Sequence, residues 1–429
     1  IGGSADDAGY GLDLGTHNDL YVTGGSNSSS FGYSCPGLKQ VNNGGRADGY
    51  LLRIDLNSFA VSAYTFIGTS SYDQSYFVKT DKYGKPFIYG QSEGINGISS
   101  GVYSVKDAKM FLKKLDFNCD KIEAETTFGA LNKNKPDLSP TAFLVDQCER
   151  VFISGWGGIN FTTGFTGGGT ANMPLTSDAY QKTTDAYDFY LAVFSKNFED
   201  LQYATYFGGK SNGSVDAHEH VDGGTSRFDK KGIMYQSVCA GCGGQSLFPT
   251  TPGAWSNKNK ANNCNNALFK FDFENLNRKP QAKDSIYDVF ANDTLNFDIM
   301  VSDPDKSDSL RIVLSGDIFK DPNFPKPLPQ IVSYTRLSGV NAIRAKIVWY
   351  SNCKHAGLDT IKLTVKVYDR GCPTQDSNQA IIRIVVKDPP LTITPETICM
   401  LFNEDGSINL SWKPFVKNKF FNYVILYRQ

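Results

Sequence analysis

Short segments in which apolar and polar residues alternate run through about the first 275 residues, and this period of two predicts β-strands rather than helices. One set is rich in β-branched and aromatic residues and comprises LYVTGGS (20–26), PFIYGQS (86–92), RVFISGW (150–156) and GIMYQSV (232–238). A second set follows after long loops and comprises ADGYLLRID (47–55), AKMFLKKLD (108–116), YDFYLAVFS (187–195) and NALFKFD (266–272). Polar turns bound these segments, so we predict an all-β protein.

A short phrase precedes each group of strands and recurs about every 60 to 80 residues. Its copies are Ile1-Gly2-Gly3, Ile67-Gly68-Thr69, Phe128-Gly129-Ala130 and Phe207-Gly208-Gly209. After each copy come a strand with a polar turn, the two strands quoted above and an outgoing strand. Four antiparallel strands repeated in this way predict blades of a β-propeller, with glycine at the sharp bend between blades. Stacked β-sandwiches with the same strand rhythm are the alternative.

The repeats resemble a named family, the bacterial SBBP repeat of a seven-bladed β-propeller. The matching pieces are Ile1–Asp7, Leu20–Ser26, Asp48–Arg53, Gln202–Gly209 and Phe248–Trp255. The second copy departs from the pattern, because Thr69 stands where the second glycine belongs. Four blade units are visible, and a propeller must close its first blade on its last or leave open edges. We therefore expect this propeller to be incomplete at its N-terminal end.

Glycine becomes less frequent after Pro280 and the alternating segments lengthen. They are LNFDIMVS (295–302), AIRAKIVWY (342–350), DTIKLTVKVYD (359–369) and QAIIRIVVKD (379–388), and they predict an immunoglobulin-like β-sandwich. SINLSW (407–412) and YVILYR (423–428) resemble the first half of a fibronectin type III domain. The expected domains are propeller repeats over 1–278, the sandwich over 279–390 and a partial fibronectin III-like domain over 391–429.

Two segments of the sandwich, WYSNCKH (349–355) and VYDRGCP (367–373), resemble a domain common in large surface proteins of gliding bacteria. Such proteins are typically exported by the type IX secretion system. The resemblance implies an extracellular, cell-surface location and passage through that secretion machinery. Four Asp-Ser/Thr-apolar tripeptides also resemble the O-glycosylation sequon of the same bacteria, and their acceptors are Ser285, Thr294, Ser309 and Thr360.

The chain has nine cysteines, so at least one is free or paired outside the chain. A composition rich in Asn, Ser, Thr and Gly favours an oxidising, extracellular setting. We expect one disulfide between Cys353 and Cys372, at the two ends of a hairpin-like pair of strands. We expect a second inside the long loop of the fourth repeat, with partners among Cys239, Cys242 and Cys264.

Two clusters have residue types that bind metals. Closely spaced carboxylates at Asp303, Asp305 and Asp308 suit a hard cation such as calcium. They do not form an EF-hand, since Asp308 stands where glycine is required, and a solvated turn is the competing interpretation. The second cluster, His218, His220, Cys239 and Cys242, has zinc ligands, although a loop disulfide is the more natural interpretation of its cysteines in an oxidising compartment. No other cofactor is expected.

The loop GWGGINFTTGFTGGGTAN (155–172) contains three aromatic residues spaced by glycines. We expect Trp156, Phe161 and Phe165 to form an adaptable contact surface, because exposed aromatic rings are effective binding groups. The alternative is that they pack onto the neighbouring blade. With four histidines and no Gly-x-Ser-x-Gly motif, no catalytic triad can be assembled, and we expect no enzyme activity.

The 43 basic and 44 acidic residues nearly cancel without a basic block, which argues against nucleic-acid binding. No stretch approaches the roughly 20 apolar residues that cross a bilayer, so direct membrane insertion is not expected. The first interpretation is a secreted or cell-surface structural and adhesive protein, related to gliding motility, whose propeller loops contact other surface proteins. The second is a carbohydrate-binding module for extracellular polysaccharide, and the third is a glycoside hydrolase-like propeller enzyme.

Overall fold

Strands make up almost all of the regular structure. The computed structural model describes residues 2–131, 134–157, 169–210, 219–221, 226–229, 232–273, 277–305, 308–338, 340–356, 358–371, 375–388 and 397–412. Within these ranges the helical elements are α1 (Asp317–Lys320) and the 3-10 turn η1 (Lys196–Phe198). The expectation of an all-β protein is confirmed.

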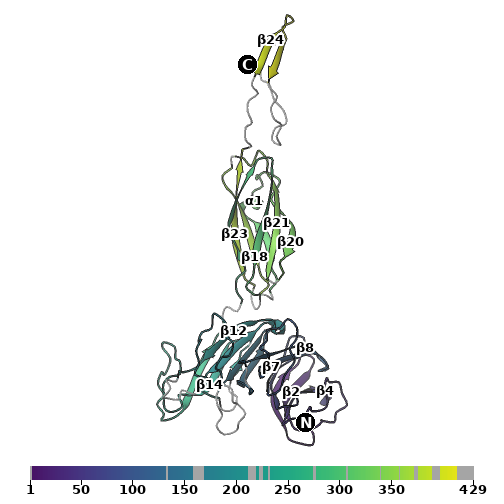
Figure 1. The fold of residues 1–429 in the computed structure, drawn as a ribbon, viewed down its shortest axis with the longest axis vertical. Helices are drawn as coiled ribbons and strands as arrows, with labels where there is room; N and C mark the ends of the chain where they lie inside the picture. The colour runs from purple at the N-terminus through teal and green to yellow at the C-terminus, as the bar shows by residue number, and fades with distance from the viewer. Residues whose placement is uncertain are drawn as a thin grey trace. The chain divides into compact units, whose positions relative to one another are not determined.

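Each repeat forms one antiparallel sheet whose strands lie in chain order (Figure 1). The first three sheets are β1 (Asp7–Leu14), β2 (Asp19–Ser26), β3 (Asp48–Asp55), β4 (Ala60–Ile67); β5 (Asp73–Thr80), β6 (Pro86–Ser92), β7 (Met110–Leu115), β8 (Ile122–Phe128); and β9 (Ser139–Val145), β10 (Val151–Trp156), β11 (Phe189–Phe194), β12 (Leu201–Phe207). The fourth has β13 (Arg227–Phe228), β14 (Met234–Ala240) and β15 (Asn265–Phe271). All eight segments quoted from the sequence overlap strands of these sheets.

Successive sheets pack face to face around separate apolar cores. Tyr21 and Leu51 of the first sheet meet Ile88 and Phe111 of the second, and equivalent clusters join the second sheet to the third and the third to the fourth. The middle sheets are therefore buried on both faces, and every side chain of β6 is buried. This stacking is blade-like. The described residues do not close a ring, so a propeller remains a prediction.

The recurring glycine marks the turn from the last strand of one sheet to the first strand of the next. In each turn a carboxylate accepts a hydrogen bond from the backbone N–H just after the glycine: Gly3 N to Asp7, Thr69 N to Asp73, Ala130 N to Asp137 and Gly209 N to Glu219, at 2.7 to 3.2 Å. A Cβ on Gly208 would lie 2.0 Å from an oxygen of Asp188. The glycine is thus required because buried carboxylates leave no room for a side chain.

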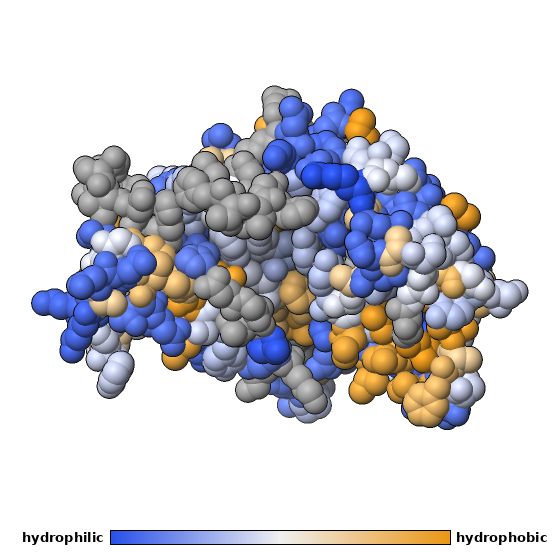
Figure 2. Space-filling view, turned by 90° about the horizontal axis from the view of Figure 1, so that it is seen from below, coloured by the Kyte–Doolittle hydropathy of each residue, from blue (hydrophilic) through white to orange (hydrophobic). Residues whose placement is uncertain are grey.

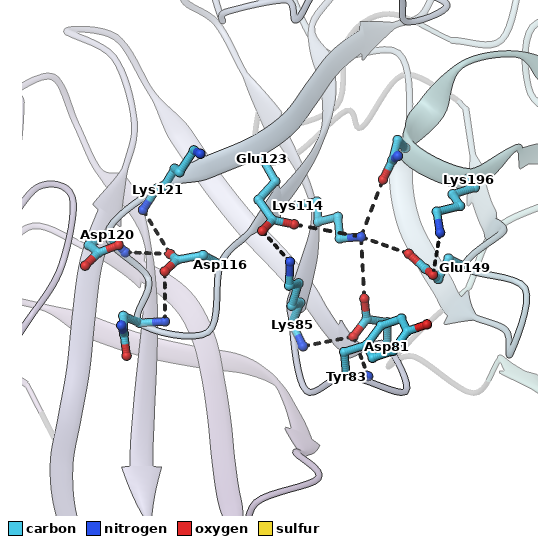
Figure 3. Close-up of polar contacts among 12 residues, drawn as sticks. Asp81, Tyr83, Lys85, Lys114, Asp116, Asp120, Lys121, Glu123, Glu149 and Lys196 are labelled. Carbon is cyan, nitrogen blue, oxygen red and sulfur yellow. Dashed lines mark hydrogen bonds and ion pairs between the residues drawn. The ribbon is translucent and has the colours of Figure 1, made fainter.

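An ion-pair network joins the second and third sheets (Figure 3). Lys114 on β7 extends its buried ammonium group to Glu149 at 2.9 Å and to Asp81 at 3.5 Å, with Glu123 at 3.9 Å. Glu149, in the turn between β9 and β10, also binds Lys196 at 2.8 Å. Burial raises the pKa of Glu149, but hydrogen bonds from the two lysines outweigh it, so the net shift is downward. The network therefore fixes the position of one sheet against the next.

Residues 277–429 form a second unit, described here by itself, apart from residues 1–276. Its two sheets are β16 (Gln281–Ala282), β18 (Thr294–Ser302), β21 (Ala342–Tyr350), β20 (Gln330–Arg336), and β17 (Ser285–Phe290), β23 (Ser377–Lys387), β22 (Ile361–Tyr368), β19 (Arg311–Ser315). Their inner faces enclose one apolar core that includes the buried Trp349. This arrangement is the expected β-sandwich.

A separate hairpin, β24 (Thr397–Phe402) with β25 (Ile408–Trp412), follows the sandwich. It contains the segment SINLSW, which was expected to be a strand. The second expected strand, YVILYR, lies outside the described residues, so the fibronectin III-like domain stays a prediction.

Candidate binding groove

The strand β15 forms an edge of the fourth sheet. It pairs with β14 from Asn265 to Phe271, and no described strand pairs with its other side. In each of the first three sheets the corresponding third strand has an outgoing strand beside it. The backbone N–H and C=O groups on the outer side of β15 are thus available to another extended chain.

A groove of about 980 Å³ opens beside this edge. Its lining includes seven aromatic residues, namely Tyr180, Tyr203, Phe207, Phe248, Trp255, Phe269 and Phe271. The rings of Phe207 and Phe269 lie 4.4 Å apart between centroids, and Phe248 lies 6.0 Å from Phe269. These contacts give the groove an apolar aromatic floor built from the third and fourth sheets.

The loop between β14 and β15 forms the other wall, and a disulfide and a set of side-chain hydrogen bonds fix its conformation. The Cys242–Cys264 disulfide closes its base. Within the loop, Asn259 donates hydrogen bonds from Nδ2 to the carbonyl oxygens of Gly241 and Asn263, at 2.9 and 2.7 Å. The expected loop disulfide is confirmed, with Cys239 outside it. The wall is therefore fixed although it contains no regular strand.

The rim of the groove is polar and basic, with one fully exposed aromatic ring. Trp255, in the FPTTPGAW segment, is 102% exposed. Three lysines, Lys258, Lys260 and Lys270, line the groove together with one acidic residue, Asp272. The excess of positive charge favours an acidic or anionic ligand.

Apolar side chains also gather in patches elsewhere on the molecule. Figure 2 shows such patches amid a mainly hydrophilic face. On the first sheet, Tyr10, Leu12 and Leu14 of β1 are each about half exposed or more. Patches of this kind mark contact surfaces more often than single exposed residues do.

Of the three aromatic residues expected to form a contact surface, Trp156 lies within the described residues. This side chain ends β10, is only partly exposed and packs against the core between the third and fourth sheets, 5.9 Å from the ring of His220. For Trp156 this packing agrees with the alternative, in which the aromatic residues pack onto the neighbouring blade. Phe161 and Phe165 lie outside the described residues.

The Cys353–Cys372 disulfide is not formed. Cys353 has a free, exposed thiol, and Asn292 Nδ2 donates a hydrogen bond to it at 3.1 Å; Cys372 lies outside the described residues. The expectation assumed that the strands before the two cysteines pair as a hairpin. Instead β21 and β22 belong to opposite sheets of the sandwich.

The zinc ligands come together only in part. One ligand atom from each of His220, Cys239 and Cys242 lies within 4.8 Å of the other two, whereas His218 is outside the described residues. Zinc requires a thiolate from cysteine. Because the sulfur of Cys242 is bonded to Cys264, this cluster favours the disulfide over zinc.

The acidic cluster differs from the expected one by one residue. Asp303 and Asp308 lie together as expected, and their third partner is Asp369. Asp305 instead pairs with Arg278, which donates to it from the backbone N at 2.7 Å and from Nε at 2.8 Å. The sequence offered no signal for Asp369, which is 61 positions beyond Asp308 and reaches it only through the fold.

A glycoside hydrolase would require a pair of carboxylates that its substrate can reach. One pair of carboxylates, Asp188 and Glu219, lies between the third and fourth sheets. Asp188 and Glu219 are 0% and 1% exposed, so a glycan has no access to them. Glu219 accepts the N–H of Gly209, and Asp188 accepts a hydrogen bond from Gln181 at 3.2 Å. These contacts assign the pair to the structure of the turn rather than to catalysis.

The four expected glycosylation acceptors, all in the sandwich, reach the surface. Thr294 and Thr360 are exposed, and Ser285 and Ser309 are half-buried. Their modification stays a prediction. None of the described helices is long and apolar enough to cross a bilayer.

No protein-family model and no curated protein matches the sequence. Among solved structures, the chain is similar to cadherin-like domains 1 to 4 of zebrafish RET (10% identity over 65% of this chain and 77% of that chain, TM-score 0.21). It is also similar to the endo-fucoidan hydrolase MfFcnA4 of glycoside hydrolase family 107 (11%, 65% and 34%, 0.17) and to the N-terminal eight Ig domains of DSCAM isoform 1.30.30 (9%, 96% and 74%, 0.16). TM-scores this low do not indicate a shared overall fold or function.

Proposed function

We propose that this chain is a structural and adhesive protein of the cell surface, and that the groove beside β15 binds an extended segment of a partner protein. The observation that supports the proposal is the free edge of β15 next to an aromatic groove. An extended peptide adds to such an edge through main-chain hydrogen bonds, and pockets for alternate side chains supply specificity.

The side chains of β15 suit this mode of binding. Ala267, Phe269 and Phe271 are partly buried and alternate with the exposed Leu268 and Lys270. Phe269 and Phe271 lie at every second position and belong to the aromatic floor. Apolar side chains of an added strand would follow the same period of two, so they would meet this floor.

The charge of the rim further restricts the type of segment that can bind. Lys258, Lys260 and Lys270 face one acidic residue, Asp272, in the lining. We therefore expect a segment with alternating apolar residues and flanking Asp or Glu. Charge complementarity of this kind mainly raises the association rate and the specificity.

An extracellular location fits the covalent chemistry of the loop. The Cys242–Cys264 disulfide closes the base of the loop that forms one wall of the groove, and disulfides persist in oxidising compartments. The resemblance to surface proteins of gliding bacteria supplies the rest of this proposal: export by the type IX machinery, with the sandwich as part of a stalk.

A polysaccharide is the second candidate ligand, and one observation favours it. The fully exposed ring of Trp255 is a flat apolar platform in a lining that also contains the amide side chain of Asn257. Sugar rings stack on such platforms while amides bind their hydroxyl groups.

Two variants distinguish a peptide ligand from a glycan ligand. The full chain is screened on an array of 12-residue peptides and on an array of bacterial extracellular oligosaccharides. For a peptide ligand, Lys258→Glu with Lys270→Glu should weaken binding at least tenfold, and Trp255→Ala should change it little. For a glycan ligand, Trp255→Ala should weaken binding at least tenfold, and the double lysine variant should change it little. Lys320→Glu, at an exposed position of α1, is the matched control; absence of binding to both arrays would contradict the proposal.

A further inference from the structure

The fold brings three aspartates together at one end of the sandwich. Asp303 follows the last residue of β18, Asp308 precedes β19 and Asp369 follows β22. β19 and β22 pair antiparallel from Arg311 opposite Tyr368, so the start of one strand lies beside the end of the other. One carboxylate oxygen from each aspartate lies within 4.8 Å of the other two.

The side chains are held with oxygen atoms turned toward one another. Asp303 Oδ1 accepts the backbone N–H of Asp305 at 2.7 Å, and Asp369 Oδ1 accepts those of Gly371 and Asp376 at 2.9 and 2.7 Å. Asp303 is therefore oriented through Oδ1 alone, whereas Asp369 is held through both oxygens, because its Oδ2 accepts a hydrogen bond from Asn277 Nδ2 at 3.2 Å. Such backbone contacts preorganise a site before the ligand binds.

One carboxylate oxygen of the cluster has no hydrogen-bond partner among the described residues although it is buried. Asp303 is 6% exposed, and its Oδ2 has no hydrogen-bond partner among the described residues. A buried, unpartnered carboxylate oxygen is costly, and in a native protein it calls for a ligand or a proton. The position of this oxygen, among two further carboxylates, points to a positively charged ligand.

The positive charge is not supplied by the neighbouring arginine. Arg278, which contacts the Asp303–Asp305 segment, is bound to Asp305 at 2.7 Å. Neither Asp303 nor Asp369 forms an ion pair with a described basic residue.

We infer that Asp303, Asp308 and Asp369 bind a divalent cation, and that this cation is calcium. The set consists only of carboxylate oxygens, the ligands of hard cations, whereas zinc prefers nitrogen and sulfur. Calcium accepts six to eight oxygens in flexible geometry, so backbone carbonyls and water can complete the shell, while magnesium demands a near-ideal octahedron. The bound ion fastens the β18–β19 connection to the end of β22.

Titration calorimetry of the full chain with CaCl2, after treatment with EDTA, tests the site. We expect Asp303→Asn and Asp369→Asn each to abolish the binding of one calcium ion per chain. Asp308 is half-exposed, so Asp308→Asn should weaken the affinity for the same ion at least tenfold. Asp298→Asn is the matched control, because Asp298 lies on β18 of the same sandwich with its side chain 47% exposed. Magnesium should bind at least tenfold more weakly than calcium.

The thermal unfolding of the sandwich gives a second readout that does not depend on variants. We expect 1 mM CaCl2 to raise its midpoint by several degrees relative to EDTA, because a ligand of the folded state alone stabilises that state. Failure of the wild-type chain to bind calcium at 5 mM would overturn the inference. An unchanged calcium stoichiometry in both Asp303→Asn and Asp369→Asn would overturn it as well.

Discussion

The carboxyl group of Glu219 lies in the turn between the third and fourth sheets with Asp188 beside it. Burial, and then the charge of Asp188, raise its pKa from 4.5 to about 9. Burial also raises the pKa of Asp188 to about 7. A recurring acidic residue thus fixes each glycine turn, and at this turn it holds a proton at neutral pH.

The sign of the pH dependence follows from the raised pKa of Glu219. Between pH 4.5 and 9 the folded state binds more protons than the unfolded state, so this group stabilises the fold most below pH 4.5. Its contribution falls as the pH rises toward 9. Glu219→Gln should therefore reduce the fall in unfolding free energy with rising pH. In urea unfolding, the stability of this variant relative to the wild type should increase from pH 5 to pH 9. Glu199→Gln, at an exposed position, should behave like the wild type at each pH; parallel curves for Glu219→Gln and wild type would contradict the assignment.

The side chains expected to be glycosylated give a second prediction for single residues. Ser285, Thr294, Ser309 and Thr360 all reach the surface of the sandwich. In protein isolated from its native host, peptide mass spectrometry should find hexose-scale additions on at least one of them, and alanine at that position should abolish the addition. Unmodified peptides at all four positions would refute the glycosylation hypothesis.

At the scale of elements, the contact between the second and third sheets depends on one buried lysine. Lys114→Met leaves the buried carboxylates of Asp81 and Glu149 without their shared cation (Figure 3). Breaking a buried ion pair in this way costs about 3–5 kcal/mol of unfolding free energy. Lys196→Met is the matched control, because Lys196 is half exposed and its loss should cost about 1 kcal/mol or less. Equal costs for the two variants, measured by urea unfolding, would show that the network does not join the sheets.

Strands were predictable where period-two alternation is strong, as in 86–92, which matches β6 without an error at either end. The acidic residue after each glycine could be read from the sequence, but its hydrogen bond with the backbone N–H of the turn could not be predicted. Pairings across the fold could not be predicted: Cys353 precedes a strand of the other sheet, and Asp369 joins Asp303 from a distant part of the chain. The FPTTPGAW segment was recognised as part of a repeat, yet the groove beside it depends on which edge of β15 stays open.

At the scale of the whole molecule, the two units have separate apolar cores. We therefore predict two transitions in scanning calorimetry of the full chain. Lys114→Met should lower the midpoint of one transition only, and Asp369→Asn should lower only the other. A single transition that both substitutions shift would mean that the units unfold together.

The central claim is that an extended partner segment adds to the edge of β15, and amide hydrogen exchange tests it most directly. The tightest-binding peptide of the array is added to the full chain, and exchange is followed in Asn265–Phe271. We predict fast exchange at the outward amides of free β15 and strong protection when the peptide is bound, with Trp255→Ala behaving like the wild type. Unchanged exchange in β15, with protection elsewhere in the chain, would contradict the claim.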